Sequence, residues 1–182
     1  MVDVVSPESR SRMMSGIRGK DTKPEIIVRK ALFAAGYRFR LHRRDLPGAP
    51  DVVMPGRMIA IFVHGCFWHM HPNWKFAKLP ATQPKFWKAK LVANVQRDQN
   101  AIEMLMSSGW RVLTVWECAT RSAVDSVTLG EKLSSWIDSS DSVSEFSGSQ
   151  SGRVFCTLMA TSNSPTYGQA NSPRQRDWNV HL

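Results

Sequence analysis

The chain has 182 residues, with 24 lysines and arginines against 15 acidic residues, a formal charge of +9 and a pI of about 9.9. This length suits one compact domain with an appendage, and the basic balance favours a polyanionic partner. The longest uninterrupted apolar run, residues 58–63, is far shorter than the roughly 20 residues of a membrane helix, which argues against a membrane protein.

The N-terminus and the cysteines both indicate a cytoplasmic location. Residues 1–14 lack the basic start, apolar stretch and small-residue cleavage site of a secretory signal. The three cysteines, Cys66, Cys118 and Cys156, are odd in number and too scattered for a disulfide framework. We therefore expect a cytoplasmic protein with reduced thiols.

Composition divides the chain into three parts. Residues 1–20 are basic and interrupted by serine and glycine, as in an arm that becomes ordered on a polyanion. Residues 139–182 lack lysine, carry no net charge and include ten serines, which favours a disordered tail. We therefore expect the folded domain at residues 21–138, where the remaining charge is concentrated.

The first predicted elements are one helix and two strands. Thr22, Pro24 and Glu25 form the signature of a helix N-terminus, with a capping hydroxyl, a first-turn proline and a glutamate at the third helical position. Strands are predicted at residues 51–54 and 58–63, separated by a Pro-Gly turn. The second strand is apolar throughout, which is typical of a central strand buried on both faces.

The second half of the domain is predicted to contain a long helix at residues 84–108, a strand at 110–116 and a closing helix at 127–137. The long helix carries apolar side chains at helical spacing, among them Phe86, for which we expect a place in the core. The order helix, strand, strand, helix, strand, helix predicts an α/β (α+β) domain with helices flanking a small mixed sheet.

The densest group of chemically active side chains follows the apolar strand. Residues 64–71, HGCFWHMH, combine three histidines with Cys66. Imidazole titrates near neutrality and binds metals, so this composition favours a metal or acid/base site. A single histidine here would more simply be a loop residue without a chemical role. Three histidines beside a thiol favour the metal or acid/base site instead.

Asp51 begins one predicted strand, and His64 ends the next. If the two strands form an antiparallel hairpin, both side chains lie at the same end of the sheet. A carboxylate and a strand-end carbonyl form an oxygen site that suits Mg²⁺. Glu25 either joins this site through water or serves only as the capping-box glutamate of its helix.

Aromatic residues are interleaved with lysines between residues 67 and 90. This pattern suggests nucleic acid, because apolar side chains can enter base steps at a cost that is lowest where pairing is already defective. The alternative is a role in the core. We favour the core for Phe76 and Phe86, and DNA contact for Phe67 and Trp68, which lie among ligand-type residues.

Five motifs then occur together in one order: KDTKPE at residues 20–25, LPGAPDVV at 46–53, HGCFWHMH at 64–71, FW at 86–87 and GWRVLTVWEC at 109–118. With these motifs the chain resembles the very-short-patch repair (Vsr) endonucleases over roughly residues 5–138. The resemblance implies a restriction-endonuclease-like fold of the PD-(D/E)xK superfamily. It also implies a Mg²⁺-dependent nick 5′ to the thymine of T·G mismatches left by deamination of 5-methylcytosine.

The same resemblance implies roles for single residues. Asp51 corresponds to the central Mg²⁺ ligand, with the backbone carbonyl of Val63 as its companion. His69 resembles the general base that prepares the attacking water, and His64 a second imidazole near the scissile phosphate. Glu25 resembles a water-mediated metal contact.

Phe67, Trp68 and Trp87 resemble the family's aromatic wedge beside the mismatch, and the N-terminal arm would clasp the duplex. The implied substrate is duplex DNA with a T·G mismatch, bound by a monomer at a bacterial-type nucleoid. Mismatch-repair and DNA polymerase proteins are the implied protein partners.

The family also contains a structural zinc ion, and here the sequence departs from its pattern. Cys66, His71 and Cys118 match three ligands, but residues 73–74 are Asn-Trp where a second loop cysteine is expected. A closed tetrahedral site needs four ligands. Either water, Asn73 or another side chain completes the site, or packing by Trp74 replaces the metal.

Two further hypotheses stay open from the sequence. One is a non-catalytic, metal-containing protein that binds mismatched or intact duplex DNA, which the combination of Asp51, His64 and His69 argues against. The other is a restriction-type endonuclease that cuts both strands, which would not need an intercalating aromatic pair.

Overall fold

The structure is a computed structural model that describes residues 19–72, 79–80, 83–121 and 123–148, without the side chains of 123–127. The predicted arm, apart from its last two residues, and the predicted tail after residue 148 lie outside this range. Within it no helix is long and apolar enough to cross a membrane. The elements in chain order are α2 (Lys23–Ala34), β1 (Arg40–Leu41), β2 (Val52–Met54), the 3₁₀ turn η1 (Pro55–Arg57), β3 (Ile59–His64), α3 (Pro84–Ser107), β4 (Arg111–Trp116), the 3₁₀ turn η2 (Glu117–Thr120), α4 (Ala123–Asp138) and β5 (Val143–Phe146).

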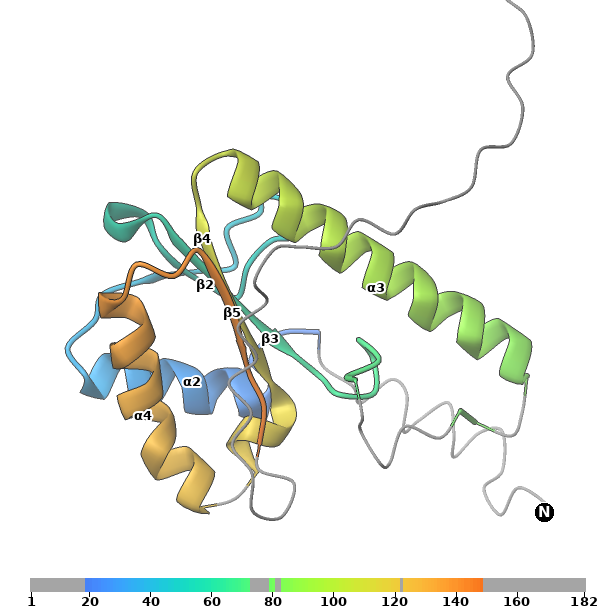
Figure 1. The fold of residues 1–182 in the computed structure, drawn as a ribbon. Helices are drawn as coiled ribbons and strands as arrows, with labels where there is room; N and C mark the ends of the chain where they lie inside the picture. The colour runs from blue at the N-terminus through green and yellow to red at the C-terminus, as the bar shows by residue number, and fades with distance from the viewer. Residues whose placement is uncertain (1–18, 73–78, 81–82, 122, 149–182) are drawn as a thin grey trace, which may run out of the picture.

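The five strands form one mixed sheet in the order β1-β2-β3-β4-β5 (Figure 1). Strands β1, β2 and β3 pair antiparallel, whereas β3 pairs parallel with β4 and β4 parallel with β5. Helix α3 makes the crossover between the parallel strands β3 and β4, as parallel pairing requires. The predicted α/β class with a small mixed sheet is therefore confirmed.

Helices cover both faces of the sheet, because successive side chains of a strand point to opposite faces. Ile59 and Ile61 of β3 pack in the larger core with side chains of α2 and α4. Ala60 and Phe62 pack in a second core with Leu105 of α3. Figure 1 shows the resulting layers, with α2 and α4 on one side of the strands and α3 on the other. This burial on both faces explains the unbroken apolar sequence of β3.

The predicted hairpin is present. Strands β2 and β3 pair with Val52 opposite Ile61 and Met54 opposite Ile59. The turn between them is η1, after which Met58 adopts a left-handed conformation with φ of 52°. Asp51, just before β2, thus lies at the end of the sheet where β3 finishes.

Two expectations need correction. Strand β5 lies beyond the boundary predicted at residue 139, so the sheet continues into the predicted tail. The strand is short and only partly buried, and it is flanked by serines, so its sequence does not stand out from the segment around it. Phe86 is 55% exposed and is not a core residue. It lies in the first turn of α3, which extends past the sheet in Figure 1, and its ring contacts Trp87 with the centroids 5.7 Å apart.

Arg111, the first residue of β4, connects this strand to the end of α4 and to the segment before β5. Its guanidinium donates hydrogen bonds to the carbonyl oxygens of Trp136 (2.7 Å), Ile137 (2.9 Å) and Asp141 (2.8 Å). It also lies 4.5 Å from the centre of the Trp136 ring. These contacts cap the C-terminus of α4, where a positive charge is favourable, and hold the segment that leads into β5.

We expect Arg111→Met to lower the free energy of unfolding by about 2 kcal/mol, because several carbonyl groups lose a charged donor. Urea denaturation followed by circular dichroism measures this loss. The matched control is Arg57→Met: its ion pair with Asp138 is exposed, so the expected loss is below about 1 kcal/mol. Equal losses in the two variants would contradict this role for Arg111.

Candidate active site

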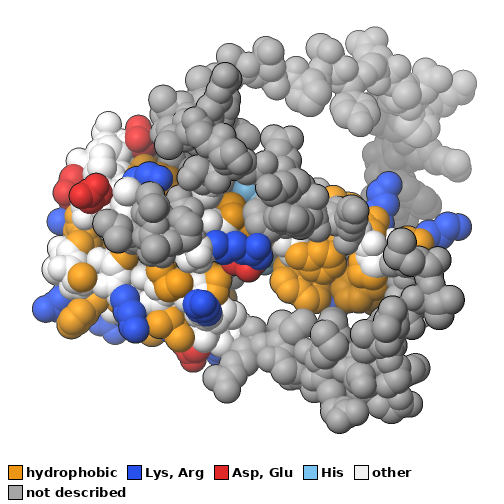
Figure 2. All heavy atoms as spheres, turned by 90° about the horizontal axis from the view of Figure 1, so that it is seen from below, with side chains coloured by type: hydrophobic (Ala, Val, Ile, Leu, Met, Phe, Trp, Pro, Cys, Tyr) orange, Lys and Arg blue, Asp and Glu red, His pale blue; other side chains and the backbone are white. Residues whose placement is uncertain are grey.

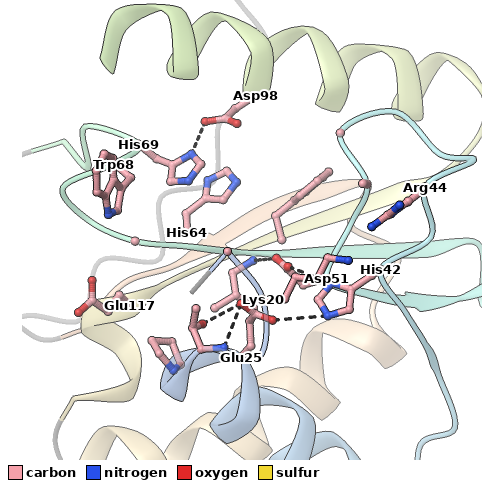
Figure 3. A pocket seen from close by; sticks show the side chains of 18 residues that line it. Lys20, Glu25, His42, Arg44, Asp51, His64, Trp68, His69, Asp98 and Glu117 are labelled. Atoms are coloured by element: carbon pink, nitrogen blue, oxygen red, sulfur yellow. Dashed lines mark hydrogen bonds and ion pairs between the residues drawn. The ribbon is translucent and has the colours of Figure 1, made fainter. Parts of the chain in front are cut away.

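A pocket of about 720 Å³ opens where β3 ends (Figure 3). Its walls come from the N-terminus of α2, the segment between β1 and β2, the end of β3 with the loop after it, and the middle of α3. The ionisable side chains that line it are Lys20, Glu25, His42, Arg44, Asp51, His64, His69, Asp98 and Glu117. The hairpin thus brings Asp51 and His64 to one pocket.

Asp51 is held by the backbone of the neighbouring strand. The Val63 N–H donates a hydrogen bond of 2.7 Å to Asp51 Oδ2. The pKa of Asp51 is raised to about 6, mainly by burial and also by the nearby charge of Glu25, while the Val63 N–H acts in the opposite direction. Asp51 is therefore a carboxylate whose charge is costly in the absence of a cation.

Glu25 is almost fully buried and does cap its helix. Its carboxylate accepts hydrogen bonds from the Asp21 N–H (3.0 Å) and the Thr22 hydroxyl (2.8 Å), and Arg29 Nη2 donates another of 2.6 Å. The capping box predicted from the sequence is present. The same carboxylate lines the pocket near Asp51, so the two predicted uses of Glu25 are compatible.

His64 and His69 lie face to face. Their ring centroids are 4.0 Å apart, with the ring planes 5° from parallel. The pKa of His64 is lowered to about 3, mainly by burial and also by the neighbouring His69, so the His64 imidazole is neutral at physiological pH. His69 lies in a turn after β3, where its N–H donates to the Gly65 carbonyl.

Asp98 on α3 is a site residue that the sequence analysis missed. Its carboxylate lies 2.5 Å from His69 Nδ1. Figure 3 marks this contact with a dashed line. A carboxylate only accepts hydrogen bonds, so Nδ1 carries the proton and Nε2 of a neutral His69 is left as an acceptor. Only the crossover of α3 brings these positions together, and no local motif marks Asp98.

A second cluster lies beside the pocket. One ligand atom each of Cys66, His71 and Cys118 lies within 4.8 Å of the others, and all three residues are buried. The hydrogen bond from the Cys66 thiol lowers the pKa of Cys118 to about 4, and His71 also lowers it. The Gly148 N–H contacts Cys118 Sγ at 3.2 Å. A side chain at residue 148 would collide with the Cys118 carbonyl, only 2.3 Å from a Cβ placed there.

Thiols and imidazole are ligand types that zinc prefers, so the three residues would supply three of the four ligands of a structural zinc site. Asn73 and Trp74, which the sequence analysis considered for the fourth position, lie outside the described residues, as does Phe76. The stacking of the His71 ring on Trp116, with centroids 4.2 Å apart, gives the imidazole a fixed orientation without any ion.

The predicted wedge residues lie together. The ring of Phe67 lies 5.2 Å from that of Trp68 and 6.1 Å from that of Trp87, and the two tryptophans are 6.0 Å apart. All three are partly exposed, and Lys90 Nζ lies within 5.6 Å of both indole rings. Figure 2 shows hydrophobic side chains gathered beside basic ones on the face it presents.

Comparison with known proteins gives consistent matches. The family described as DNA mismatch endonuclease Vsr matches residues 2–75. A type II nicking enzyme, V.XorIIP of Xanthomonas oryzae, is 49% identical over 118 residues, which cover 65% of this chain and 86% of the relative. The DNA mismatch endonuclease Vsr of Escherichia coli is 42% identical over 139 residues, covering 75% of this chain and 88% of the relative.

The chain is thereby a DNA endonuclease, and its mixed sheet has the restriction-endonuclease-like fold. The chain belongs to the Vsr family of DNA mismatch endonucleases, since it spans most of the length of relatives at over 40% identity. The resemblance inferred from the five sequence motifs is confirmed.

Asp51→Asn should stabilise the metal-free protein, because an amide has no charge to desolvate. Ionisation of Asp51 in the folded protein lowers the free energy of unfolding. This loss is absent below pH 3.8, grows as the pH rises to about 6 and is complete above that value. We expect a gain of about 2 kcal/mol in the free energy of unfolding near neutral pH that vanishes towards pH ~4.

Urea denaturation in the presence of a chelator, repeated at several pH values, measures this gain. The control is Asp45→Asn, an exposed carboxyl whose pKa Arg43 lowers to about 2, and it should give no gain. A loss of stability in Asp51→Asn near neutral pH would show that burial of the charge is not the dominant effect.

Proposed function

We propose that the protein hydrolyses one phosphodiester bond of duplex DNA, 5′ to the thymine of a T·G mispair, with Mg²⁺ as cofactor. The observation that carries the proposal is the pocket that Asp51 lines together with the stacked pair His64 and His69, with Asp98 bonded to His69. Similarity to proteins named mismatch endonucleases and nicking enzymes supports cleavage of a single strand. The motif resemblance supplies the T·G mispair of deaminated 5-methylcytosine as the substrate.

His69 is the general base in this proposal. The hydrogen bond from Nδ1 to Asp98 fixes the ring and stabilises the imidazolium that forms when Nε2 takes a proton from water. His64 remains neutral beside it and supplies a second imidazole near the phosphate. Stacking of the two rings limits how far His69 can turn away from its productive orientation.

Asp51 would hold the Mg²⁺ ion, with the Val63 carbonyl as its companion and Glu25 acting through water. The residues fit this ion because two carboxylates line the pocket and the charge of Glu25 disfavours that of Asp51, so a cation would be favourable beside Asp51. When bound, Mg²⁺ stabilises the negative charge that develops on the phosphate oxygens. Asp51 keeps its orientation for this task through the Val63 N–H.

The aromatic cluster is proposed to enter the duplex beside the mispair. Phe67 and Trp68 lie on the loop that also carries His69, and Trp87 lies at the start of α3. Insertion unstacks a base step, and a T·G mispair lowers this cost because its stacking and pairing are already weakened. Lys90 near the indoles, and Lys20 and Arg44 at the pocket, would contact phosphates.

We also propose that Cys66, His71 and Cys118 bind one structural zinc ion, with the fourth ligand open to water or a loop side chain. The buried, partly ionised thiol pair supports this assignment. A site with three protein ligands binds zinc less tightly than one with four.

The nuclease proposal is tested with strand-labelled duplexes carrying a T·G mispair or the matched T·A pair. With Mg²⁺, the protein should nick only the thymine strand of the mispaired duplex. Asp51→Ala should abolish nicking, and His69→Ala should lower the single-turnover rate by about 10²- to 10⁴-fold. Asp45→Ala, an exposed carboxylate outside the pocket, is the matched control.

Other outcomes identify the alternatives. Mg²⁺-independent binding without any nick would support a non-catalytic mismatch-binding protein. Cleavage of both strands of the matched duplex would support a restriction-type enzyme. Equal nicking by wild type and Asp51→Ala would reject the proposed centre.

For the second metal, elemental analysis of the purified protein should find about one zinc per chain. Cys118→Ser should lose this zinc, because the substitution removes one of the two thiolates, and it should lower the melting temperature. Cys156→Ser is the control. Zinc-free wild-type protein with an unchanged melting temperature after zinc addition would mean that packing has replaced the ion.

A further inference from the structure

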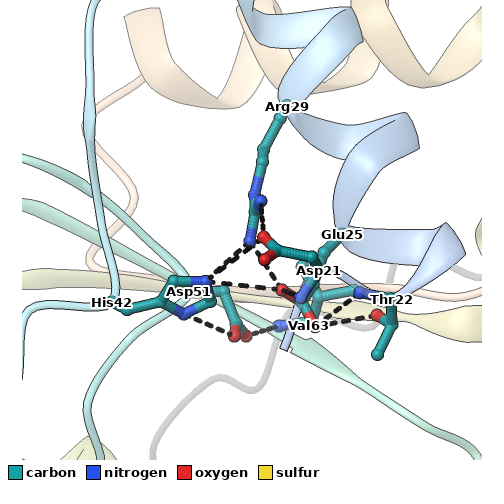
Figure 4. Close-up of polar contacts among 7 residues, drawn as sticks. All are labelled: Asp21, Thr22, Glu25, Arg29, His42, Asp51 and Val63. Carbon is teal, nitrogen blue, oxygen red and sulfur yellow. Dashed lines mark hydrogen bonds and ion pairs between the residues drawn. The ribbon is translucent and has the colours of Figure 1, made fainter. Parts of the chain in front are cut away.

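Arg29, one helical turn after Glu25 on α2, makes a set of contacts that the proposed chemistry does not use. Its Nη1 lies 2.5 Å from Asp21 Oδ1, and its Nη2 donates to Glu25 Oε2 at 2.6 Å (Figure 4). The same Nη2 lies 2.9 Å from Nε2 of His42. The Arg29 side chain is only 12% exposed, so these contacts are largely shielded from water.

The contact with His42 determines which ring nitrogen carries the proton. A guanidinium group can only donate hydrogen bonds, so His42 Nε2 must accept here and carries no proton. In the neutral ring the proton therefore resides on Nδ1. That nitrogen faces the pocket and lies 3.8 Å from Asp51 Oδ1.

The two oxygens of Asp51 then have different neighbours. Val63 donates its N–H to Oδ2, and His42 presents its Nδ1–H towards Oδ1. A separation of 3.8 Å is longer than a hydrogen bond, so the N–H acts on Oδ1 through its dipole or through a bridging water. Both contacts favour one orientation of the carboxylate.

Without Arg29 the opposite arrangement would be preferred. His42 Nε2 also lies 3.7 Å from Asp21 Oδ1 and 3.8 Å from Glu25 Oε2. A proton on Nε2 would be attracted to these carboxylates, and the Nδ1 lone pair would then face the negative oxygen of Asp51. The guanidinium prevents this arrangement because it occupies the place between His42 and the two carboxylates.

We propose that Arg29 is a positioning residue that fixes His42 as the Nδ1–H tautomer, so that His42 orients Asp51 for its role in the pocket. The inference rests on the proposed function only for the role of Asp51. The tautomer of His42 can be measured without any cleavage assay. Failure of one proposal is therefore distinguishable from failure of the other.

The first test is long-range ¹H–¹⁵N NMR of the histidine rings in the full chain, with His42 assigned by comparison with His42→Gln. We expect the Nδ1–H tautomer in wild type and a change to the Nε2–H form in Arg29→Met. Arg57→Met, which removes the same charge from an exposed site, should leave the His42 signals unchanged. An Nε2–H tautomer in wild type would overturn the proposal, even if Arg29→Met does not fold.

The second test compares two substitutions of His42. Glutamine keeps one acceptor for Arg29 and one N–H for Asp51, whereas leucine removes both. We expect His42→Leu to lower the single-turnover nicking rate about tenfold more than His42→Gln, with the DNA dissociation constant unchanged. Equal rates in the two variants, or an effect on DNA affinity alone, would overturn the positioning role.

Discussion

The antiparallel pairing of β2 with β3 is the constraint on which the site depends. It places Asp51 beside the backbone of Val63, whose N–H holds the carboxylate, and leaves His64 at the exit of the same hairpin. Burial of both faces of β3 fixes the register of this pairing, because a slip of one residue would exchange the side chains that face the two cores. Hydrophobic packing thus sets the position of the proposed catalytic groups.

The charged carboxylates of the site lower the free energy of unfolding, and neighbouring groups reduce this loss. Glu25 is buried and Asp51 is partly buried, and the charge of Glu25 disfavours the ionised form of Asp51. Glu25 is compensated by direct hydrogen bonds from the N-terminus of α2 and from Arg29. Among the described residues, Asp51 accepts one backbone N–H, and His42 and Arg29 act on its charge from a greater distance. The carboxylate with the weaker compensation is the one that a divalent cation would stabilise.

Local patterns account for the parts of the structure that sequence analysis predicted. The long helix, the central strand and the hairpin follow from apolar periodicity and turn residues, and the hairpin in turn predicts that Asp51 and His64 share an end of the sheet. The capping box likewise predicts the position of Glu25 at the start of α2. Each of these inferences needs only residues that are close in sequence.

The features that were missed depend on tertiary packing. Asp98 lies 29 positions from His69 and contacts it because α3 crosses over the sheet. Arg29 lies 13 positions from His42 and contacts it because the chain turns back between α2 and β1. No local spacing reveals either contact. Strand β5 has too few apolar residues to differ from the serine-rich segment around it, and it forms by pairing with β4. Phe86 has the spacing of a core residue, but it lies in the first turn of α3. That turn precedes Leu91, the first residue of the helix that is buried.

The central claim is that the end of the hairpin forms a divalent-cation site around Asp51. Paramagnetic Mn²⁺, which takes the oxygen ligands of Mg²⁺, tests this claim through the distance-dependent broadening of backbone amide signals in NMR spectra. Substoichiometric Mn²⁺ should selectively broaden the amide signals of Val63 and His64 in wild type and leave them sharp in Asp51→Ala. Sharp signals for both residues in wild type, or the same broadening in Asp51→Ala, would contradict the account.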